Sequence, residues 1–177
     1  MKPQPACSRH RNNSVIRICP IEREDLDQLF ALDQICFRPG ISYSKAELNS
    51  LLRHRHSISC AAVDADNPGR KIVGFAIAEH YAERGRGIGH IVTIDVAPDQ
   101  RRRGIGERLM QTLTDGLIEA DVTLIRLEVA VDNIEAQAFY RKLGFRPGAR
   151  IAGFYMGTLD AIRMERNIGS QNQPDRM

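Results

Sequence analysis

A dense run of arginines stands directly before two closely spaced glycines near the middle of the chain. It reads Arg101-Arg102-Arg103-Gly104-Ile105-Gly106, and it follows a segment of strand character that ends at Val96. A helix that begins here has first-turn N–H groups without intrahelical partners, and its dipole adds partial positive charge. Glycines let a phosphate approach the backbone, and guanidinium groups bind polyanions such as a pyrophosphate. The segment therefore predicts an anion seat, with a plain strand-to-helix turn as the alternative.

A second segment, from residue 127 to residue 145, places an acid and a phenol where a strand passes into a helix. Glu128 lies among apolar residues of the expected strand. Such a carboxylate either faces the surface by alternation or is buried with a raised pKa, and a raised pKa suits a general base near neutral pH. Tyr140 lies on the expected helix and has a proton that it can donate to a leaving thiolate.

Alternating strands and helices must position these two segments. Period-two and helical spacing predict strands at 15–19, 57–63, 72–81, 89–96, 122–131, from 145 onward and at 161–167, and helices at 22–36, 44–53, from 104 through 117 and at 133–143. Strand-helix units near the centre favour parallel pairing, whereas the hairpins favour antiparallel flanks. The pattern predicts a mixed α/β fold.

Length and composition fit one globular domain. The chain has 177 residues, with 42% hydrophobic and 27% charged residues and a net charge of +3. We expect polar tails at 1–14 and 169–177 around a domain at 15–168. The sequence has no apolar run of about 20 residues and no secretory signal in its first residues, so we expect a cytoplasmic protein without a membrane partner. The mild charge predicts no nucleic-acid partner, and a monomer or a dimer is expected.

The spacing of the four cysteines, all in the first third of the chain, bears on metal binding and on disulfides. They are Cys7, Cys19, Cys36 and Cys60, and no two of them form a C-x-x-C pair. Neither a zinc site nor a disulfide framework is expected from that spacing. We predict free or buried thiols and no bound metal.

The two chemical segments resemble the Gcn5-related N-acetyltransferase (GNAT) family. The resemblance lies in R-x-x-G-x-G at 101–106 and in L-E-V, D-N and A-x-x-F-Y-x-x-L-G-F between 127 and 145, and it extends over 15–167. It is strongest to the branch that acetylates protein N-terminal amines, including the ribosomal-protein alanine acetyltransferases. It implies a mostly antiparallel sheet splayed between its central parallel strands and flanked by helices.

The resemblance also implies an activity, namely transfer of an acetyl group from acetyl-CoA to a primary amine, here a protein or peptide N-terminal α-amine. A small-molecule amine (polyamine, amino acid or aminoglycoside) is an alternative acceptor. A non-catalytic acyl-CoA-binding module is the other alternative, although such a module has no need of both Glu128 and Tyr140.

The resemblance assigns roles to individual residues. Glu128 matches the general base, acting through water, and Tyr140 matches the general acid near the cofactor sulfur. The residues implied to bind acetyl-CoA are Ile94, Asp95, Val96, Arg101, Arg102, Arg103, Gly104, Ile105, Gly106, Glu107, Asn133 and Tyr140.

Two departures from the family pattern bear on the acceptor and on the base. Tyr43 stands in the acceptor loop where this branch often has a tryptophan, and Asp95 places a carboxylate on a strand where the branch often has a small residue. Asp95, or water without a dedicated base, is therefore an alternative to Glu128, and His90 is a weaker one. A loop expected at 150–158 faces the acceptor, and Tyr155 either bonds the substrate terminus or only packs.

Overall fold

A computed structural model describes residues 14–168, so the two expected tails lie almost wholly outside the described residues. The described chain forms a sheet of seven strands in the order β1-β2-β3-β4-β5-β7-β6. Its elements are β1 Ile16–Cys19, α1 Leu26–Cys36, α2 Lys45–Arg53, β2 Ser57–Asp64, β3 Lys71–Glu83, β4 Arg86–Val96, α3 Ile105–Glu119, β5 Leu124–Ala130, α4 Ile134–Lys142, β6 Arg146–Tyr155 and β7 Leu159–Asn167. The predicted mixed α/β fold is confirmed.

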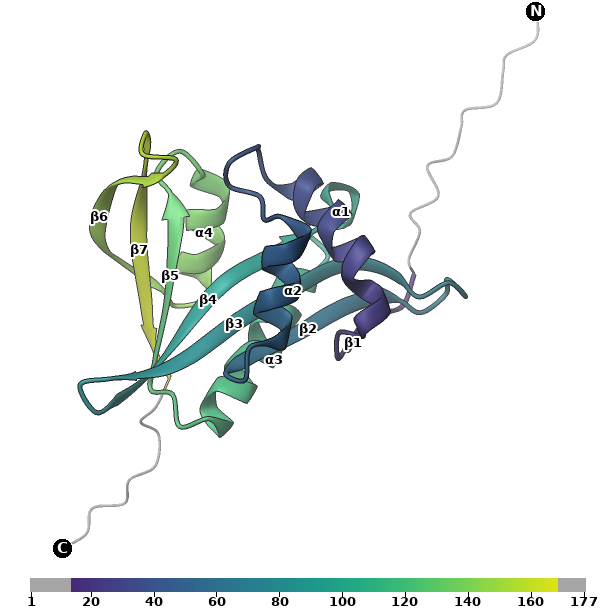
Figure 1. The fold of residues 1–177 in the computed structure, drawn as a ribbon, viewed down its shortest axis with the longest axis horizontal. Coiled ribbons are helices and arrows are strands. Elements are labelled where there is room, and N and C mark those ends of the chain that lie inside the picture. The colour runs from purple at the N-terminus through teal and green to yellow at the C-terminus, as the bar shows by residue number, and fades with distance from the viewer. Residues whose placement is uncertain (1–13, 169–177) are drawn as a thin grey trace, which may run out of the picture.

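Helices cover both faces of the sheet (Figure 1). Leu29 of α1 and Leu48 of α2 are fully buried and pack in one cluster with Phe75 of β3. On the opposite face, Leu109 and Leu113 of α3 are fully buried in a second cluster. Because side chains alternate along a strand, β3 supplies apolar residues to both clusters. Because helices cover both faces of β3, its side chains are buried on both sides of the sheet.

The sheet opens between β4 and β5, its one parallel pair in the described chain. Their pairing covers only Ile88–His90 against Leu124–Arg126, so the two strands have no ladder beyond that point. β4 also contains a bulge, because Ile91 pairs with Ala78 and Thr93 pairs with Ile77, which leaves Val92 as the extra residue. A bulge bends its strand and changes which face the following side chains take. The bulge lies where the two strands part.

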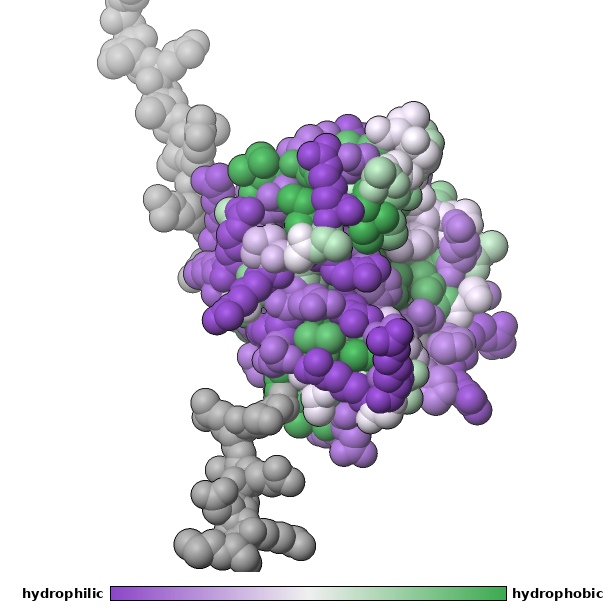
Figure 2. Space-filling view, turned by 90° about the vertical axis from the view of Figure 1, so that its left-hand side faces the viewer, coloured by the Kyte–Doolittle hydropathy of each residue, from purple (hydrophilic) through white to green (hydrophobic). Residues whose placement is uncertain are grey.

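The loop expected at 150–158 is wrong in its extent. Residues 150–155 belong to β6, which pairs with β7, and the chain turns only at 156–158. The side chains at the start of β6 are exposed because it is an edge strand, so no apolar alternation marks it. Figure 2 shows this side of the molecule, where apolar patches are separated by hydrophilic side chains.

Smaller differences concern the ends of elements. The helix expected from residue 22 begins as a 3-10 turn at Arg23–Asp25, and α1 follows it. The β3–β4 hairpin closes through Arg84 and Gly85, both at positive φ, so its turn is shorter than expected. The capping box predicted at Ser44 is present. Within 14–168, no helix has the length and apolar character to cross a membrane.

Candidate active site

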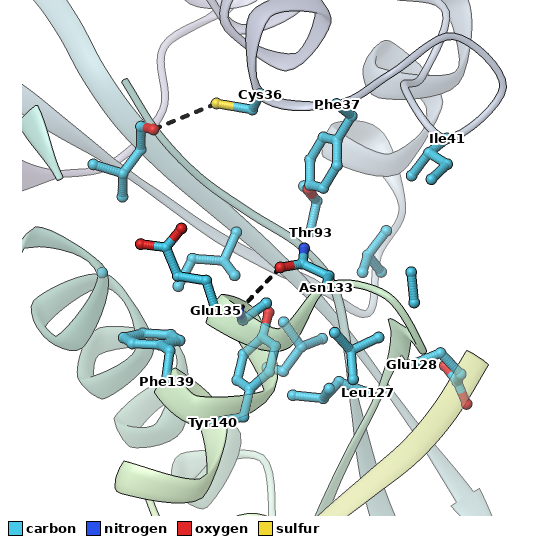
Figure 3. Close-up of a pocket in the computed structure, with 18 of the residues that line it drawn as sticks. Cys36, Phe37, Ile41, Thr93, Leu127, Glu128, Asn133, Glu135, Phe139 and Tyr140 are labelled. Atoms are coloured by element: carbon cyan, nitrogen blue, oxygen red, sulfur yellow. Dashed lines mark hydrogen bonds between the residues drawn. The ribbon is translucent and has the colours of Figure 1, made fainter. Parts of the chain in front are cut away.

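A cleft of 630 Å³ passes through the opening between β4 and β5. At one end it reaches the first turn of α3, and α4 forms one wall (Figure 3). At the other end it reaches the loop between α1 and α2, together with the end of β6. Its volume is in the range typical of ligand and cofactor sites. The cleft therefore connects the two faces of the sheet.

The two glycines of the predicted anion-binding segment, residues 101–106, are required for different structural reasons. Gly104 is the N-cap of α3 with φ +74°, and a Cβ at this position would meet no atom within 4 Å. That conformation favours glycine, and it leaves the N–H groups of the first turn open to the cleft. Gly106 lies against Phe139 of α4, since a Cβ there would fall 3.1 Å from its Cζ. The second glycine allows the close approach of α3 and α4.

The three arginine side chains of this segment lie in different surroundings. Arg101 and Arg102 line the cleft, and the Arg102 side chain is 88% exposed with its nearest acid, Glu135, at 3.9 Å. Arg103 instead donates to the backbone oxygen of Ser14 at 3.0 Å and does not line the cleft. Its guanidinium ties the start of the described chain to the seat segment. Two of the three arginines therefore line the cleft, and their binding to a ligand stays a prediction.

Most of the predicted cofactor residues lie along the cleft. Those that line it are Ile94, Val96, Arg101, Arg102, Gly104, Ile105, Gly106, Glu107, Asn133 and Tyr140. Asn133 caps α4, because its Oδ1 accepts from the Ala136 N–H at 3.0 Å, and this leaves its amide nitrogen to face a ligand (Figure 3). Cys36 also lines the cleft, which its sequence context did not indicate, and burial raises the pKa of its thiol to about 11.

Asp95 lies outside the cleft lining. Its side chain is on the face of Phe75, its register partner, and the residue is 1% exposed. One oxygen accepts from the Thr93 hydroxyl at 2.9 Å, and the other has no hydrogen-bond partner. Burial holds the pKa of Asp95 well above its ordinary value. The bulge at Val92 sets this orientation, so the carboxylate does not line the cleft.

Glu128 lies at the opening between the strands and is bonded on both oxygens. Oε2 is 2.7 Å from His90 Nε2, and Oε1 accepts from Arg163 Nε at 2.9 Å. Burial by itself raises the pKa of Glu128, but the hydrogen bonds from His90 and Arg163 outweigh it and lower the pKa below its ordinary value. The side chain is only 7% exposed, so both sequence expectations, a surface carboxylate or a raised pKa, are wrong.

Tyr140 reaches the cleft from the α4 side. The residue is 8% exposed, and burial raises the pKa of its phenol well above the ordinary value. The hydroxyl therefore stays protonated at neutral pH. In Figure 3, the Tyr140 ring and the Glu128 side chain lie on different sides of the cleft, with Glu128 turned toward β7.

Two further tyrosines use their hydroxyls on the backbone. Tyr43 donates to the Val92 oxygen at 3.3 Å, and Tyr155 donates to the Glu128 backbone oxygen at 3.1 Å. The Tyr155 bond holds the end of β6 onto β5. A hydroxyl oxygen that donates can still accept, so a bond from a substrate terminus to Tyr155 stays a prediction. Within residues 14–168, no group of three or more His, Cys, Asp or Glu side chains is arranged to hold a metal ion.

Comparison with known proteins agrees with this geometry. The model of the acetyltransferase (GNAT) family matches residues 25–145. The chain belongs to this family. N-alpha-acetyltransferase 30 of Schizosaccharomyces pombe is 30% identical over 122 residues, which are 68% of this chain and 79% of that protein. N-alpha-acetyltransferase RimI of Mycobacterium tuberculosis is 30% identical over 155 residues, which are 87% and 94% of the two chains.

The fold is shared with solved members of the family. The crystal structure of Arabidopsis thaliana NAA60 in complex with acetyl-CoA matches with a TM-score of 0.78 at 24% identity, over 87% of this chain and 99% of that one. Family and relatives together make this GNAT protein an acetyl-CoA-dependent N-acetyltransferase. The predicted donor and reaction class are confirmed.

A substitution at the first glycine tests the phosphate seat. Gly104→Asp places a carboxylate beside the first-turn N–H groups of α3, so we expect the Kd of acetyl-CoA to rise by about 10-fold or more. Gly85→Asp is the matched control, because Gly85 has φ +77° and equally open surroundings in the β3–β4 turn. Calorimetry with acetyl-CoA measures both; equal affinities in the two variants contradict the assignment.

The buried carboxylate makes a prediction about stability. Asp95 has a higher pKa in the folded state than in the unfolded state. Its contribution to stability is complete below the unfolded pKa and is lost as the pH rises toward the folded pKa. Asp95→Asn removes this loss, so the variant gains on the wild type by up to about 1.4 kcal/mol per pH unit above pH 4. Urea unfolding from pH 4 to pH 8 measures the free energy of unfolding of both proteins. A difference between them that does not change with pH contradicts a raised pKa of Asp95.

Proposed function

We propose that this acetyltransferase acts on the α-amine at the N-terminus of a protein or peptide. The observation behind the proposal is the cleft itself, which passes through the sheet from the first turn of α3 to the His90–Glu128 pair and opens between two loops. Such a passage lets a thioester enter from one face and an amine from the other. The relatives named above are N-alpha-acetyltransferases, which supports this acceptor.

The cofactor enters at the α3 end. Its pyrophosphate is held by the N–H groups of the first turn after Gly104, with the Arg102 guanidinium near by. Its pantetheine amides bond the backbone of β4 near Ile94 and Val96, since β4 has no strand neighbour on the β5 side beyond His90. The Val96 oxygen already accepts from Arg101 Nε at 3.2 Å and from the Cys36 thiol at 3.4 Å, so it is not the group that the cofactor uses. Asn133 donates its amide nitrogen from the start of α4. These positions lead the thioester toward the opening of the sheet.

His90 and Glu128 remove the proton of the amine as a pair. Glu128 remains ionised because its pKa is low, and it orients the imidazole through the 2.7 Å contact with Nε2. The lone pair of Nδ1 then accepts the proton, directly or through water. In this assignment Glu128 positions the imidazole, and His90 takes the role of general base that the sequence assigned to Glu128.

The remaining steps need little further chemistry. The neutral amine attacks the thioester carbon and a C–N bond forms. The C–S bond breaks as the tetrahedral intermediate collapses, and the nitrogen, which is positively charged after the attack, releases one proton to solvent to give the amide. The leaving thiolate takes the proton of the Tyr140 hydroxyl, which is protonated at neutral pH and lines the cleft. The proton that the imidazole received leaves to solvent, and the phenol is reprotonated before the next cycle.

Removal of the Tyr140 hydroxyl tests the acid. Tyr140→Phe keeps the ring in its buried site, so we expect kcat to fall by about 100-fold while the Kd of acetyl-CoA stays the same. Tyr81→Phe, on an exposed tyrosine of the β3 end, is the control. Steady-state kinetics and calorimetry separate the two effects, and an unchanged kcat removes Tyr140 from this role.

Removal of the Glu128 charge tests the pair. Glu128→Gln keeps the size of the side chain but loses the carboxylate that orients the imidazole through the contact with Nε2, so we expect kcat at neutral pH to fall by about 10-fold or more while the Kd of acetyl-CoA stays the same. Glu165→Gln, whose carboxylate bonds Arg126 instead, serves as the control. Steady-state kinetics measure both variants, and an unchanged kcat in Glu128→Gln rules out the pair.

A further inference from the structure

Two carboxylates lie at the end of the cleft where the phosphates of acetyl-CoA are proposed to bind. Glu107 is in the first turn of α3 and Glu135 is in the first turn of α4, and both residues line the cleft. In Figure 3 the Glu135 side chain extends from the start of α4 into the cleft and away from Glu128. Coenzyme A carries its negative charge on a pyrophosphate and a 3′-phosphate, and nearby carboxylates repel that charge. This end of the cleft therefore contains groups that oppose its own ligand.

The same acids hold two of the cations that line this end. Lys142 of α4 donates from Nζ to Glu107 Oε1 at 2.5 Å, and the Arg102 guanidinium lies 3.9 Å from Glu135 Oε1. Each of these four side chains is at least 44% exposed. Ion pairs that are this exposed contribute little to the stability of a fold. Their effect on a charged ligand is therefore the larger consequence of their position.

Both acids also stand at the positive ends of helices. A first-turn acid stabilises its helix, because the N–H groups without intrahelical partners and the dipole favour a negative charge there. The first-turn N–H groups of α3 are the ones proposed to hold the pyrophosphate, so the Glu107 carboxylate competes with the ligand for the same positive potential. Glu135 has the equivalent position on α4, directly after Asn133, which is also a proposed cofactor residue.

The charge balance at this end is close to neutral. The cations Arg101, Arg102 and Lys142 and the two carboxylates line it together, which leaves one net positive charge. When phosphates bind, the cations turn to them, and the carboxylates stay within a few ångströms of the bound charge. Screening leaves much of the repulsion, since the Debye length is about 8 Å at physiological ionic strength. The carboxylates therefore lower the affinity that the cations alone would give.

The substrate and the product carry the same phosphates. Acetyl-CoA and CoA differ only at the sulfur, so attraction at the phosphate end holds both of them equally. Such uniform binding lowers the Kd without accelerating the chemical step. A product that is held tightly also delays the next turnover, and product release limits the rate of many enzymes. Weaker binding of the phosphates therefore favours the exchange of CoA for acetyl-CoA.

We propose that the carboxylates of Glu107 and Glu135 set the affinity for coenzyme A, by weakening the hold on its phosphates and speeding the release of the product. The inference rests on the position given to the cofactor in the proposed function and adds the charges that oppose it. It concerns the phosphate end of the cleft alone and is independent of the acceptor amine.

Neutral variants of the two acids test the proposal. Glu107→Gln and Glu135→Gln keep the size of the side chain and remove its charge. In the full-length protein at about 0.05 M KCl, we expect the Kd of CoA to fall by about 3- to 10-fold in each variant and further in the double variant. In about 1 M KCl the Debye length is about 3 Å, so the difference from wild type shrinks to less than about 2-fold. Calorimetry measures the Kd, and stopped-flow displacement of CoA by excess acetyl-CoA measures a slower dissociation.

A matched control separates the site from the net charge. Glu119→Gln makes the same change of charge at the last residue of α3, and Glu119 does not line the cleft, so its Kd equals that of wild type. A Kd that is unchanged or raised in both acid variants overturns the inference. So does a fall that persists in about 1 M KCl, a fall of equal size in Glu119→Gln, or a fall that comes only from faster association. Loss of helix stabilisation alone would lower the Tm and leave the Kd unchanged.

An arginine variant separates the two possible failures. Arg102→Gln removes a cation from the same end, so we expect the Kd of CoA to rise by about 3-fold or more. If this variant changes the Kd and the acid variants do not, the cofactor position stands and the inference is overturned. If none of the three substitutions changes the Kd, the phosphates bind elsewhere, and the proposed cofactor position falls together with the inference. The acceptor is not involved in either outcome, because only CoA is bound.

Discussion

The structure depends on the parting of two parallel strands. Only three residues of β4, Ile88–His90, pair with β5, and beyond them the sides of the two strands that face each other share no ladder, although β4 stays paired with β3 and β5 with β7. Some backbone groups at the gap are met by side chains, since Tyr43 donates to the Val92 oxygen and Tyr155 to the Glu128 oxygen. The cleft occupies the rest of the gap and reaches the first turn of α3. The proposed function uses this space, with the pantetheine chain of acetyl-CoA between the strands and the amine coming from the other face.

The position of the titratable groups follows from this opening. His90 is the last paired residue of β4, and Glu128 lies two residues beyond the last paired residue of β5. Both stand at the vertex of the gap, where the backbone is still held by the ladder. Arg163 reaches the vertex from β7, because β7 pairs antiparallel with β5 and places it opposite Glu128. The His90–Glu128 pair is thus held by three strands, β4, β5 and β7.

Local patterns predicted much of this arrangement. The seat around Gly104 and the helix that carries Tyr140 depend on short spacings, and the structure places both at the cleft. The environment of Glu128 was not predictable, since His90 and Arg163 are 38 and 35 residues away in sequence. Whether such groups meet is decided by the order of strands in the sheet, which no local pattern contains.

Other errors have equally concrete reasons. The orientation of Asp95 depends on one extra residue in β4, because a bulge exchanges the faces of every side chain after it. Arg103 turns away from the cleft because the backbone of Ser14 offers an acceptor. β6 was read partly as a loop, since an exposed edge strand needs no apolar alternation. In each case the surroundings of a residue depend on pairing or contacts that its local sequence does not specify.

The contact of Met156 with Gly40 has a consequence for how one end of the cleft is built. The end at α3 and α4 comes from one continuous stretch, β4 through α4, whereas the other end joins the loop between α1 and α2 to the end of β6, segments more than a hundred residues apart. The relative position of these two segments depends on contacts between them, such as that of the Met156 sulfur with Gly40. Any residue other than glycine at position 40 must displace the Met156 side chain, so a change far from β4 and α4 alters the shape of the cleft at this end.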